Sequence, residues 1–314
     1  MDAMTITQSD WTAAGWDAHL GRSIGGSVAL QQSGCYGAIA AAGGCRVVRY
    51  SIWRNGRLIG AAQVLQRRGL AWLGRGPVWQ AGLSPAVKRT GLRSLARALF
   101  PLPLIATAAH CDDPPSGVPL VTQRAHAMWD LGPCTADLQA RLYPKWRNAM
   151  LRALRSDLVL TQEDDPAWLV GAEAAQRKAR GYSGLPSAFV EAWASEGGGR
   201  LALALRDAQG QPHAGMVFLC HGDTASYHLG WRDPRRPTSG VHAALLWQSA
   251  LWLRAGGMAW LDLGGVDSTQ TPGLMRFKLG TGAGVHTLGA TTWVFPAFSR
   301  LRPDKATRMC DSAQ

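Results

Sequence analysis

The sequence lacks the short motifs that identify several common classes of enzyme. It contains no G-x-S-x-G, no H-E-x-x-H and no G-x-x-x-x-G-K-[ST], so a nucleophile-elbow hydrolase, a zincin and a P-loop protein have no support. Residues 21–26 are rich in glycine, but they lack the preceding strand that a dinucleotide-binding loop requires. We interpret them as a turn.

Long apolar runs and closely spaced cysteines are also missing. The apolar stretch at residues 96–109 is interrupted by Pro101 and Pro103, and the N-terminus does not resemble a signal peptide. We therefore expect a cytoplasmic protein without a transmembrane segment. The six cysteines show no C-x-x-C spacing, and the histidine, cysteine and aspartates at 110–113 are consecutive. Consecutive side chains rarely converge on one ion, so we predict no metal and no cofactor.

Acidic residues are few in comparison with basic ones. Lysine and arginine total 33 residues against 21 aspartates and glutamates, which gives a formal net charge of +12 at pH 7. Such a charge raises the local concentration of polyanions, so nucleic acid, anionic lipid headgroups and phosphorylated small molecules all fit as partners. Arginine supplies most of the charge, which favours bidentate phosphate contact. A GC-rich genome that encodes arginine in place of lysine accounts for the bias equally well.

The two halves of the chain repeat one order of predicted elements, namely a hairpin, a third strand, a helix and a further strand. In the first half these elements are the strands at 45–53 and 58–67 around Asn55-Gly56, then 70–73, 84–100 and 102–107. In the second half they are 201–205 and 214–220, then 224–231, 241–254 and 259–263. The repeat predicts an α/β protein with mixed α+β sheets in two domains, residues 1–156 and 157–314.

A helix with apolar side chains at four-residue spacing is predicted over residues 135–154, close to the domain boundary. Its polar positions are rich in arginine and lysine. We expect one continuous helix there.

The last third of the chain contains the strongest functional signal. An apolar strand that includes Asp262 breaks at Gly264 and Gly265, a polar loop follows, and residues 273–280 then run Gly-Leu-Met-Arg-Phe-Lys-Leu-Gly. Glycines that expose the backbone, together with a nearby cation, are typical of a site on a loop that a sheet holds in place.

Each candidate residue in this region has a structural alternative. Lys278 beside Phe277 suits a phosphate or a terminal nucleotide, but it also fits an exposed basic pair at the end of a helix. Asp262 either orients the glycine backbone or forms a turn. Tyr227 and His228 lie near the end of a strand that faces the same region. One of them belongs to the core, and His228 is a weak candidate for a general base.

These residues together resemble the FemABX family of aminoacyl-tRNA-dependent peptidyltransferases. The resemblance is strongest over residues 262–265 and 273–280, which are similar to the family's C-terminal signature of a strand, an aspartate, glycines and a phenylalanine–lysine pair before a glycine. Weaker similarities occur at Gln32-Ser33, at residues 75–78 and at residues 145–148. The pattern is also similar to an acyltransferase group associated with cellulose and exopolysaccharide loci.

The resemblance implies two tandem GNAT-like domains that transfer an amino acid from charged tRNA to an amine, for example on a peptidoglycan precursor. It implies catalytic roles for Lys278, Asp262 and Tyr227, and contact of Phe277, Lys278 and Arg276 with the donor tRNA. It further implies an acceptor site with Arg75, Tyr36 and Arg147, and a transient contact with the membrane surface.

Two alternatives to this function stay open on the sequence alone. The first keeps the fold but takes an acyl-CoA as donor, although the sequence has no clear Q/R-x-x-G-x-G/A loop for the pyrophosphate. The second is an RNA-binding module without catalysis. The acceptor also stays open, because the lysine that nucleotide-sugar binders of the family carry after Gln-Ser is replaced here by a run of alanine and glycine.

Overall fold

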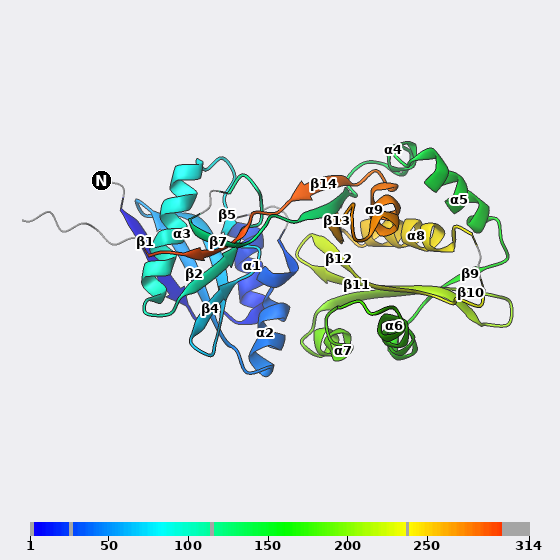
Figure 1. Ribbon diagram of the computed structural model, residues 1–314, viewed down its shortest axis with the longest axis horizontal. Coiled ribbons are helices and arrows are strands. Elements are labelled where there is room, and N and C mark those ends of the chain that lie inside the picture. The colour runs from blue at the N-terminus through cyan, green and yellow to red at the C-terminus, as the bar shows by residue number, and fades with distance from the viewer. Residues whose placement is uncertain (1–2, 25–27, 114–115, 237–238, 297–314) are drawn as a thin grey trace, which may run out of the picture.

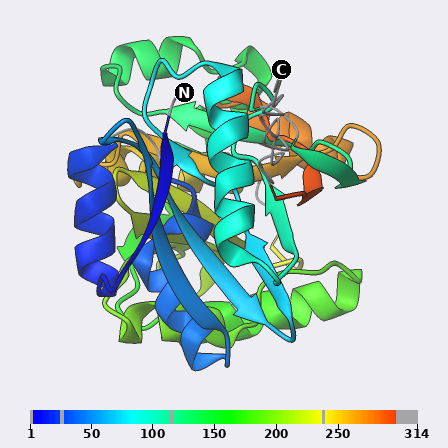
Figure 2. The same cartoon turned by 90° about the vertical axis from the view of Figure 1, so that its left-hand side faces the viewer.

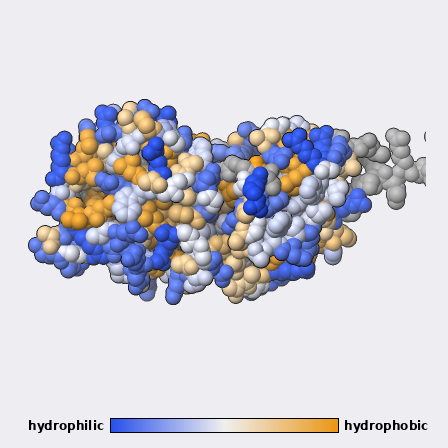
Figure 3. All heavy atoms as spheres, turned by 180° about the vertical axis from the view of Figure 1, so that it is seen from behind, coloured by the Kyte–Doolittle hydropathy of each residue, from blue (hydrophilic) through white to orange (hydrophobic). Residues whose placement is uncertain are grey.

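The chain folds into two mixed sheets with helices on their faces. A computed structural model describes residues 3–24, 28–113, 116–236 and 239–296. Figure 1 shows an elongated molecule with the N-terminal domain on the left and the C-terminal domain on the right. Seen from behind, the two lobes meet at a narrower waist, and hydrophilic residues are spread over both (Figure 3).

The N-terminal sheet has the strand order β1-β2-β3-β4-β6-β15-β7, with β5 paired to β3. Its strands are β1 (Met4–Ser9), β2 (Arg46–Arg54), β3 (Arg57–Arg67), β4 (Leu70–Leu73), β5 (Val78–Trp79), β6 (Leu104–Thr107), β7 (Gly117–Val121) and β15 (Thr291–Val294). Its helices are α1 (Ala13–Ser23), α2 (Gly34–Ala42) and α3 (Pro85–Leu99). Figure 2, which looks onto this domain from its outer end, shows α3 in front of the sheet.

Local sequence explains the two clearest features of this domain. Asn55 and Gly56 both have positive φ, 50° and 76°, as a two-residue hairpin turn between β2 and β3 requires. Ser84 caps α3 by accepting a hydrogen bond from the N–H of Val87, and Pro85 occupies the first turn. The predicted hairpin and helix are therefore confirmed.

The C-terminal sheet has the order β14-β8-β13-β12-β11-β10-β9. Its strands are β8 (Ala125–Asp130), β9 (Val159–Gln162), β10 (Gly199–Arg206), β11 (Pro212–His221), β12 (Thr224–Arg232), β13 (Trp260–Val266) and β14 (Gly284–Thr287). Its helices are α4 (Thr135–Ala140), α5 (Pro144–Leu154), α6 (Ala167–Arg180), α7 (Ala188–Ser195), α8 (Val241–Ala255) and α9 (Pro272–Leu279).

Helices cover both faces of this second sheet. On one face, α5 and α8 bury a core that includes Trp146, Phe218 and Leu246. On the other face, α6 and α7 bury a second core around Trp193 and Val217. Figure 1 shows α8 and α9 above the sheet and α6 and α7 below it. The arrangement is a three-layer α/β sandwich.

The single helix predicted over residues 135–154 is wrong. The structure has two helices, α4 and α5, separated by a break at residues 141–143. Pro144 explains the break, because its ring disfavours a helical conformation of the preceding residue and it starts a new helix at the first position.

The two sheets do not coincide with the predicted ranges 1–156 and 157–314. Strand β8 and helices α4 and α5 pack with the C-terminal sheet, whereas β15, close to the end of the chain, lies between β6 and β7 in the N-terminal sheet. The chain therefore crosses between the sheets after β7 and returns after β14. Trp129 on β8 is buried in the core that α5 and α8 cover, and this burial fixes the assignment of β8 to the C-terminal domain.

The two domains also touch through helices. Tyr36 on α2 packs against Phe189 on α7, with ring centroids 6.0 Å apart, and the thiol of Cys35 donates to the backbone oxygen of Trp193 at 3.4 Å. Within the described ranges, no helix combines the length and the apolar character that crossing a bilayer would require.

Candidate active site

The double glycine of the C-terminal signature forms a β-bulge in β13. Asp262 pairs with Met128 of β8 and Gly265 pairs with His126, so two residues of β13 lie opposite one residue of β8. Gly264, inside the bulge, has a φ of 78°, a conformation that residues with a Cβ rarely adopt. Its N–H donates to Oδ1 of Asp262 at 2.8 Å. The bulge therefore holds the carboxylate against its own strand.

Asp262 joins charged groups from both domains. Its Oδ2 accepts a hydrogen bond from Nη1 of Arg75 at 2.6 Å, and its Oδ1 lies 3.2 Å from Nδ1 of His126. Only 6% of the residue is exposed. Burial alone would raise the pKa of Asp262, but the hydrogen bond from His126 and the charge of Arg75 hold it well below its ordinary value. The carboxylate is therefore ionised at neutral pH.

Arg75 reaches this carboxylate from the loop that follows β4 in the N-terminal domain. Its φ of 48° lies in the left-handed region, which is unusual for a residue with a long side chain. Its Nε is buried and has no hydrogen-bond partner among the described residues. The ion pair therefore fastens one domain to the other, and it leaves one donor of the guanidinium unused.

Lys278 is buried in the same cluster and is not an exposed helix-end residue. It lies on α9, is only 6% exposed, and its Nζ donates to the backbone oxygen of Gly265 at 2.7 Å. Burial lowers the pKa of Lys278 to about 8, although the negative charge of Asp262 acts in the opposite direction. A lysine with this pKa is cationic at pH 7 and can give up its proton readily.

Phe277 points from α9 toward the start of α8. Its ring centroid lies 6.1 Å from that of His242 in the first turn of α8 and 6.3 Å from that of Trp146 on α5. Gly280 makes the second contact possible, because a Cβ at this position would collide with the ring of Trp146. The glycine that closes the signature therefore allows α9 to pack closely on α5.

The strands β12 and β13 diverge at this site. They pair in parallel over only three positions, the last of which joins Ser226 to Asp262. Beyond Asp262, β13 bulges toward α9, and β12 continues to Arg232 without β13 as a neighbour. A gap between two parallel strands exposes backbone groups of both strands, and these groups are available to a ligand that enters the gap.

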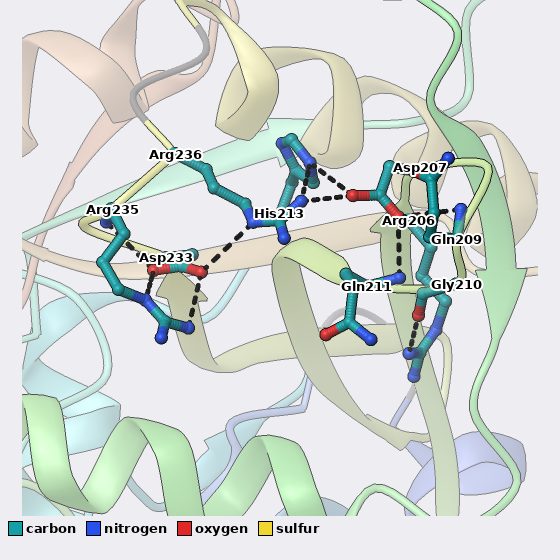
Figure 4. A network of polar contacts seen from close by, with 9 residues as sticks. All are labelled: Arg206, Asp207, Gln209, Gly210, Gln211, His213, Asp233, Arg235 and Arg236. Carbon is teal, nitrogen blue, oxygen red and sulfur yellow. Dashed lines mark hydrogen bonds and ion pairs between the residues drawn. The ribbon is translucent and has the colours of Figure 1, made fainter.

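The loop between β12 and α8 carries two arginines that are already paired (Figure 4). Arg235 binds the buried Asp233 through Nε and Nη2, each at 3.0 Å. Arg236 pairs with Asp207 of the hairpin between β10 and β11 and lies 3.7 Å from Asp233. The two guanidinium groups are therefore held by carboxylates beside the sheet.

A cavity of about 420 Å³ opens between the two domains beside the network of Asp262. One ion pair and one hydrogen bond between side chains lie in the wall of the cavity. Nζ of Lys88 lies 2.7 Å from Oδ1 of Asp113, and Nε2 of His286 lies 2.6 Å from Nδ1 of His110. Both domains line the cavity, with side chains that include Arg75, Trp79, Lys88, His110, Trp260 and His286.

The structure brings together some of the residues that the sequence singled out. Lys278, Asp262 and Arg75 form one cluster, and Phe277 lies on the same helix as Lys278. Arg276, also on this helix, is exposed. Arg75 is the one predicted residue among the described residues that line the cavity, whereas Asp262, Lys278 and Phe277 are not among them.

Three further predicted residues have other surroundings. Tyr227 packs its ring on Phe218 at 5.7 Å, and burial raises the pKa of its hydroxyl above the usual value, so that the hydroxyl stays protonated. Tyr36 lies at the contact between α2 and α7. Arg147 is half-buried on α5. None of the three is among the described residues that line the cavity.

His228 is unsuited to act as a base at the cluster. Its ring stacks on Phe189 at a centroid distance of 5.7 Å, in the core beneath α7. Burial lowers its pKa to about 4. The imidazole is therefore a neutral core group.

Three histidines at the site were not predicted from the sequence. His126 and His286 are register partners on β8 and β14, and His110 bonds to His286. Burial is the main cause that lowers the pKa of His286, and the nearby charge of His110 acts in the same direction. The only signal in the sequence is alternation around His126, which does not reveal that β8 borders β13.

Residues 142–279 match a family profile described as an acetyltransferase (GNAT) domain. The range extends from α5 to α9 and contains the diverging strands, Asp262 and Lys278. Comparison with curated proteins gave no match.

Several solved structures have a similar fold. A crystal structure of FemX has a TM-score of 0.73 at 12% identity, with 90% of this chain and 96% of that chain covered. A conserved protein of unknown function from Bacteroides thetaiotaomicron VPI-5482 has a TM-score of 0.58 at 13% identity, with 91% and 100% covered. A tandem GNAT protein from the clavulanic acid biosynthesis pathway has a TM-score of 0.51 at 12% identity, with 94% and 100% covered.

These likenesses confirm the predicted fold of two GNAT-like domains in tandem, and they bear out the resemblance to FemABX proteins at the level of the fold. The match over residues 142–279, which is less than half of the chain, supports the prediction of a GNAT-type acyltransferase. The donor and the acceptor are separate questions, because identities this low concern the fold alone.

Proposed function

We propose that the protein transfers an aminoacyl group from the 3′ end of an aminoacyl-tRNA to an amine and thereby forms an amide bond. The observation that carries the proposal is the burial of Lys278 beside Asp262 and the Gly265 carbonyl, where β12 and β13 diverge. A donor that enters the gap between the strands would bring its reacting carbonyl beside this cation. The cation would then stabilise the negative charge that develops on the carbonyl oxygen in the transition state.

The reaction depends more on the positioning of the two reactants than on acid–base catalysis. The amine nitrogen of the acceptor attacks the carbonyl carbon of the donor ester, a C–N bond forms, and the C–O bond to the ribose breaks. The attacking nitrogen loses one proton, and the ribose oxygen leaves with one. Because the ester is already activated, most of the rate enhancement comes from holding the two reactants together.

We assign the charged groups on this basis. The ammonium of Lys278 stabilises the oxyanion and, with its pKa of about 8, provides the proton for the leaving ribose oxygen. Asp262 holds Arg75 and His126 in place and balances the charge of Lys278. Its low pKa makes it a positioning group and a poor base.

Three observations favour tRNA over acyl-CoA as the donor. Residues 235–240 run Arg-Arg-Pro-Thr-Ser-Gly, so the first glycine of a Q/R-x-x-G-x-G/A pyrophosphate-binding loop is missing before α8, although Gly240 fits its last position. Arg235 and Arg236 before that helix are paired with carboxylates. The ring of Phe277, which faces the first turn of α8, offers a surface on which a terminal base stacks.

We place the acceptor in the cavity between the domains. Its indole rings, Trp79 and Trp260, provide apolar walls, and Arg75 and Lys88 provide positive charge. An amine attached to an anionic carrier, such as a cell-wall precursor or another small peptide, fits this combination. The predicted catalytic role of Tyr227 and the predicted acceptor-binding roles of Tyr36 and Arg147 remain proposals, and none of the three residues is among the described residues that line this cavity.

The acetyltransferase description of the matching family favours a second candidate, N-acyl transfer from acyl-CoA. A donor competition separates the two. The protein is incubated with ¹⁴C-aminoacyl-tRNA and, in parallel, with ¹⁴C-acetyl-CoA, each with an extract of small-molecule amines as acceptor. The expected result is acceptor-dependent loss of label from tRNA with a new alkali-stable amide product. Turnover of acetyl-CoA alone would establish the second candidate.

Binding without turnover of either donor would point to an RNA-binding module. The tRNA affinity is expected to fall steeply as salt is added, because the protein is strongly basic. Uncharged tRNA serves as the control for binding that does not depend on the aminoacyl group.

A further inference from the structure

One half of the N-terminal sheet carries an apolar row that no described helix covers. Trp72 on β4 pairs with Ile105 on β6, Ile105 pairs with Trp293 on β15, and Trp293 pairs with Val118 on β7. Residues that pair directly across strands point to the same face of a sheet. The four side chains therefore lie side by side across four strands.

This row is open to solvent. The exposed fractions are 45% for Trp72, 44% for Trp293 and 49% for Val118, and the same face continues to Leu70 and Phe295, each 44% exposed. The opposite face of these strands is buried under α3 in the core of the domain. An apolar face of this extent on one side of a folded domain marks a contact surface.

The edge of the sheet is protected against pairing with another strand. Pro119 lies in the middle of β7, the last strand of the sheet, and it has no N–H to donate to a neighbouring strand. A partner of this region therefore meets the flat face and not the edge.

The charged residues beside this apolar face indicate the chemistry of its partner. Between Asp17 and Asp112 the sequence contains no aspartate or glutamate, so β4 and β6 carry no carboxylate. Arg67 pairs with Leu70 at the end of the row, and Arg68 follows in the exposed turn between β3 and β4. The apolar face is thus bordered by positive charge.

We propose that this face docks the protein on an anionic lipid membrane. Tryptophan prefers the boundary between lipid headgroups and acyl chains, and arginines beside it are attracted to anionic headgroups. A second copy of the chain is a poor occupant, because a symmetric contact would bring the arginines of both copies together. Single-stranded RNA stacks on aromatic planes, but Leu70, Ile105 and Val118 offer none.

Vesicle sedimentation tests the proposal without reference to activity. The full-length protein is mixed with phosphatidylglycerol–phosphatidylcholine vesicles or with pure phosphatidylcholine vesicles, and the bound fraction is measured. The wild type is expected to bind the anionic vesicles at least tenfold more tightly. The double variant Trp72→Ala/Trp293→Ala should lose roughly tenfold of this affinity, since two large apolar side chains no longer enter the bilayer.

Matched variants keep the test falsifiable. Trp252→Ala removes a tryptophan that is also 44% exposed but lies on α8 of the other domain, and it should bind as the wild type does. Arg67→Glu reports the charge contribution without touching the aromatic pair. Thermal melting checks that each variant is folded.

The proposal is overturned if the wild type does not bind anionic vesicles, or if the folded double variant binds them equally well. It is also overturned if sedimentation without lipid shows a dimer that only the double variant loses, or if that variant loses affinity for tRNA and not for vesicles. Because catalysis is not measured, these outcomes are independent of the proposed aminoacyl transfer.

Discussion

The two domains share one arrangement of strands but use it differently. In each domain a hairpin leads into a strand that pairs in parallel with the strand after the next helix, β4 with β6 and β12 with β13. Each pairing covers three positions. The last pair is Leu73 with Ala106 in the N-terminal domain and Ser226 with Asp262 in the C-terminal domain.

The two domains differ beyond the last of these pairs. After Asp262 the strand bulges at Gly264 and leads to α9 with its buried lysine. After Leu73 the chain leaves the sheet and presents Arg75 to the other domain. The duplicated fold therefore places the charged gap in the C-terminal copy only, and the N-terminal copy contributes one arginine and a wall of the cavity. Substitutions in the gap and at the contact between the domains test this division.

The largest expected effect follows from removing the cation of the C-terminal copy. Lys278→Ala should reduce transfer by roughly a hundredfold or more, because a positioned donor at an oxyanion contributes on that scale. Single-turnover release of the aminoacyl group from tRNA measures it. Lys178→Ala, at an exposed lysine near the end of α6, is the control and should retain normal transfer. A normal rate in Lys278→Ala would remove this lysine from the site.

The second-largest effect is expected from breaking the ion pair that connects the domains. Asp262→Asn leaves the guanidinium of Arg75 largely buried without a counter-charge, so we expect a loss of about 3 kcal/mol in the free energy of unfolding. Urea denaturation measures it. Asp113→Asn breaks the pair with Lys88, whose side chain is 20% exposed against 13% for Arg75, so the cation left behind is better hydrated and the cost should be smaller, about 1 kcal/mol. Equal costs for the two changes would show that the network of Asp262 does not hold the domains together.

The pH dependence of transfer should report the titration of Lys278. The protonated form is the active one, and burial lowers its pKa to about 8. With an acceptor amine that is already neutral at pH 7, the rate should be constant near pH 7 and fall about tenfold per unit above pH 8. In Lys278→Arg the guanidinium stays charged, so any residual activity should show no such fall. A rate that continues to rise above pH 9 would contradict this role.

The smallest effect concerns the bulge. Gly264→Ala places a Cβ in a left-handed conformation, 3.5 Å from Nζ of Lys278, and should destabilise the fold by about 1 kcal/mol. Gly265→Ala is the matched control, because a Cβ there meets nothing closer than the backbone oxygen of Ala125 at 3.9 Å. Thermal melting of the two variants compares them. Identical melting temperatures would show that the positive φ is not what the double glycine provides.

Much of the fold could be predicted from the sequence because its signals are local. Alternation, the Asn55-Gly56 turn and the order of strand and helix depend on neighbouring residues, and they identified the repeated unit. The order of strands within a sheet is not local. The pairing of β15 with β6 and of β8 with β13 joins segments that are far apart in the chain, and no pattern inside either segment specifies the partner.

The residues of the candidate site also fall into two groups, those that local sequence reveals and those that only the pairing of distant strands brings to the site. Asp262, Phe277 and Lys278 lie within one short stretch whose glycines and charges mark it, so they could be identified before the structure. His126, His110 and His286 reach the site only through the register of β8 and β14. Tyr36 was named from a resemblance over the N-terminal half, and the structure places it in the contact between α2 and α7. The burial of Lys278, which gives the residue its low pKa, also depends on tertiary packing.

Single-turnover transfer from ³H-aminoacyl-tRNA to an amine acceptor, by the wild type and by Lys278→Ala with acetyl-CoA as a competitor, distinguishes aminoacyl transfer at Lys278 from acetyl transfer. We expect label to move from tRNA to an amide product in the wild type only, and an excess of acetyl-CoA should not slow this transfer. Label that stays on tRNA in the presence of acceptor, with acetyl groups transferred in its place, would contradict the account.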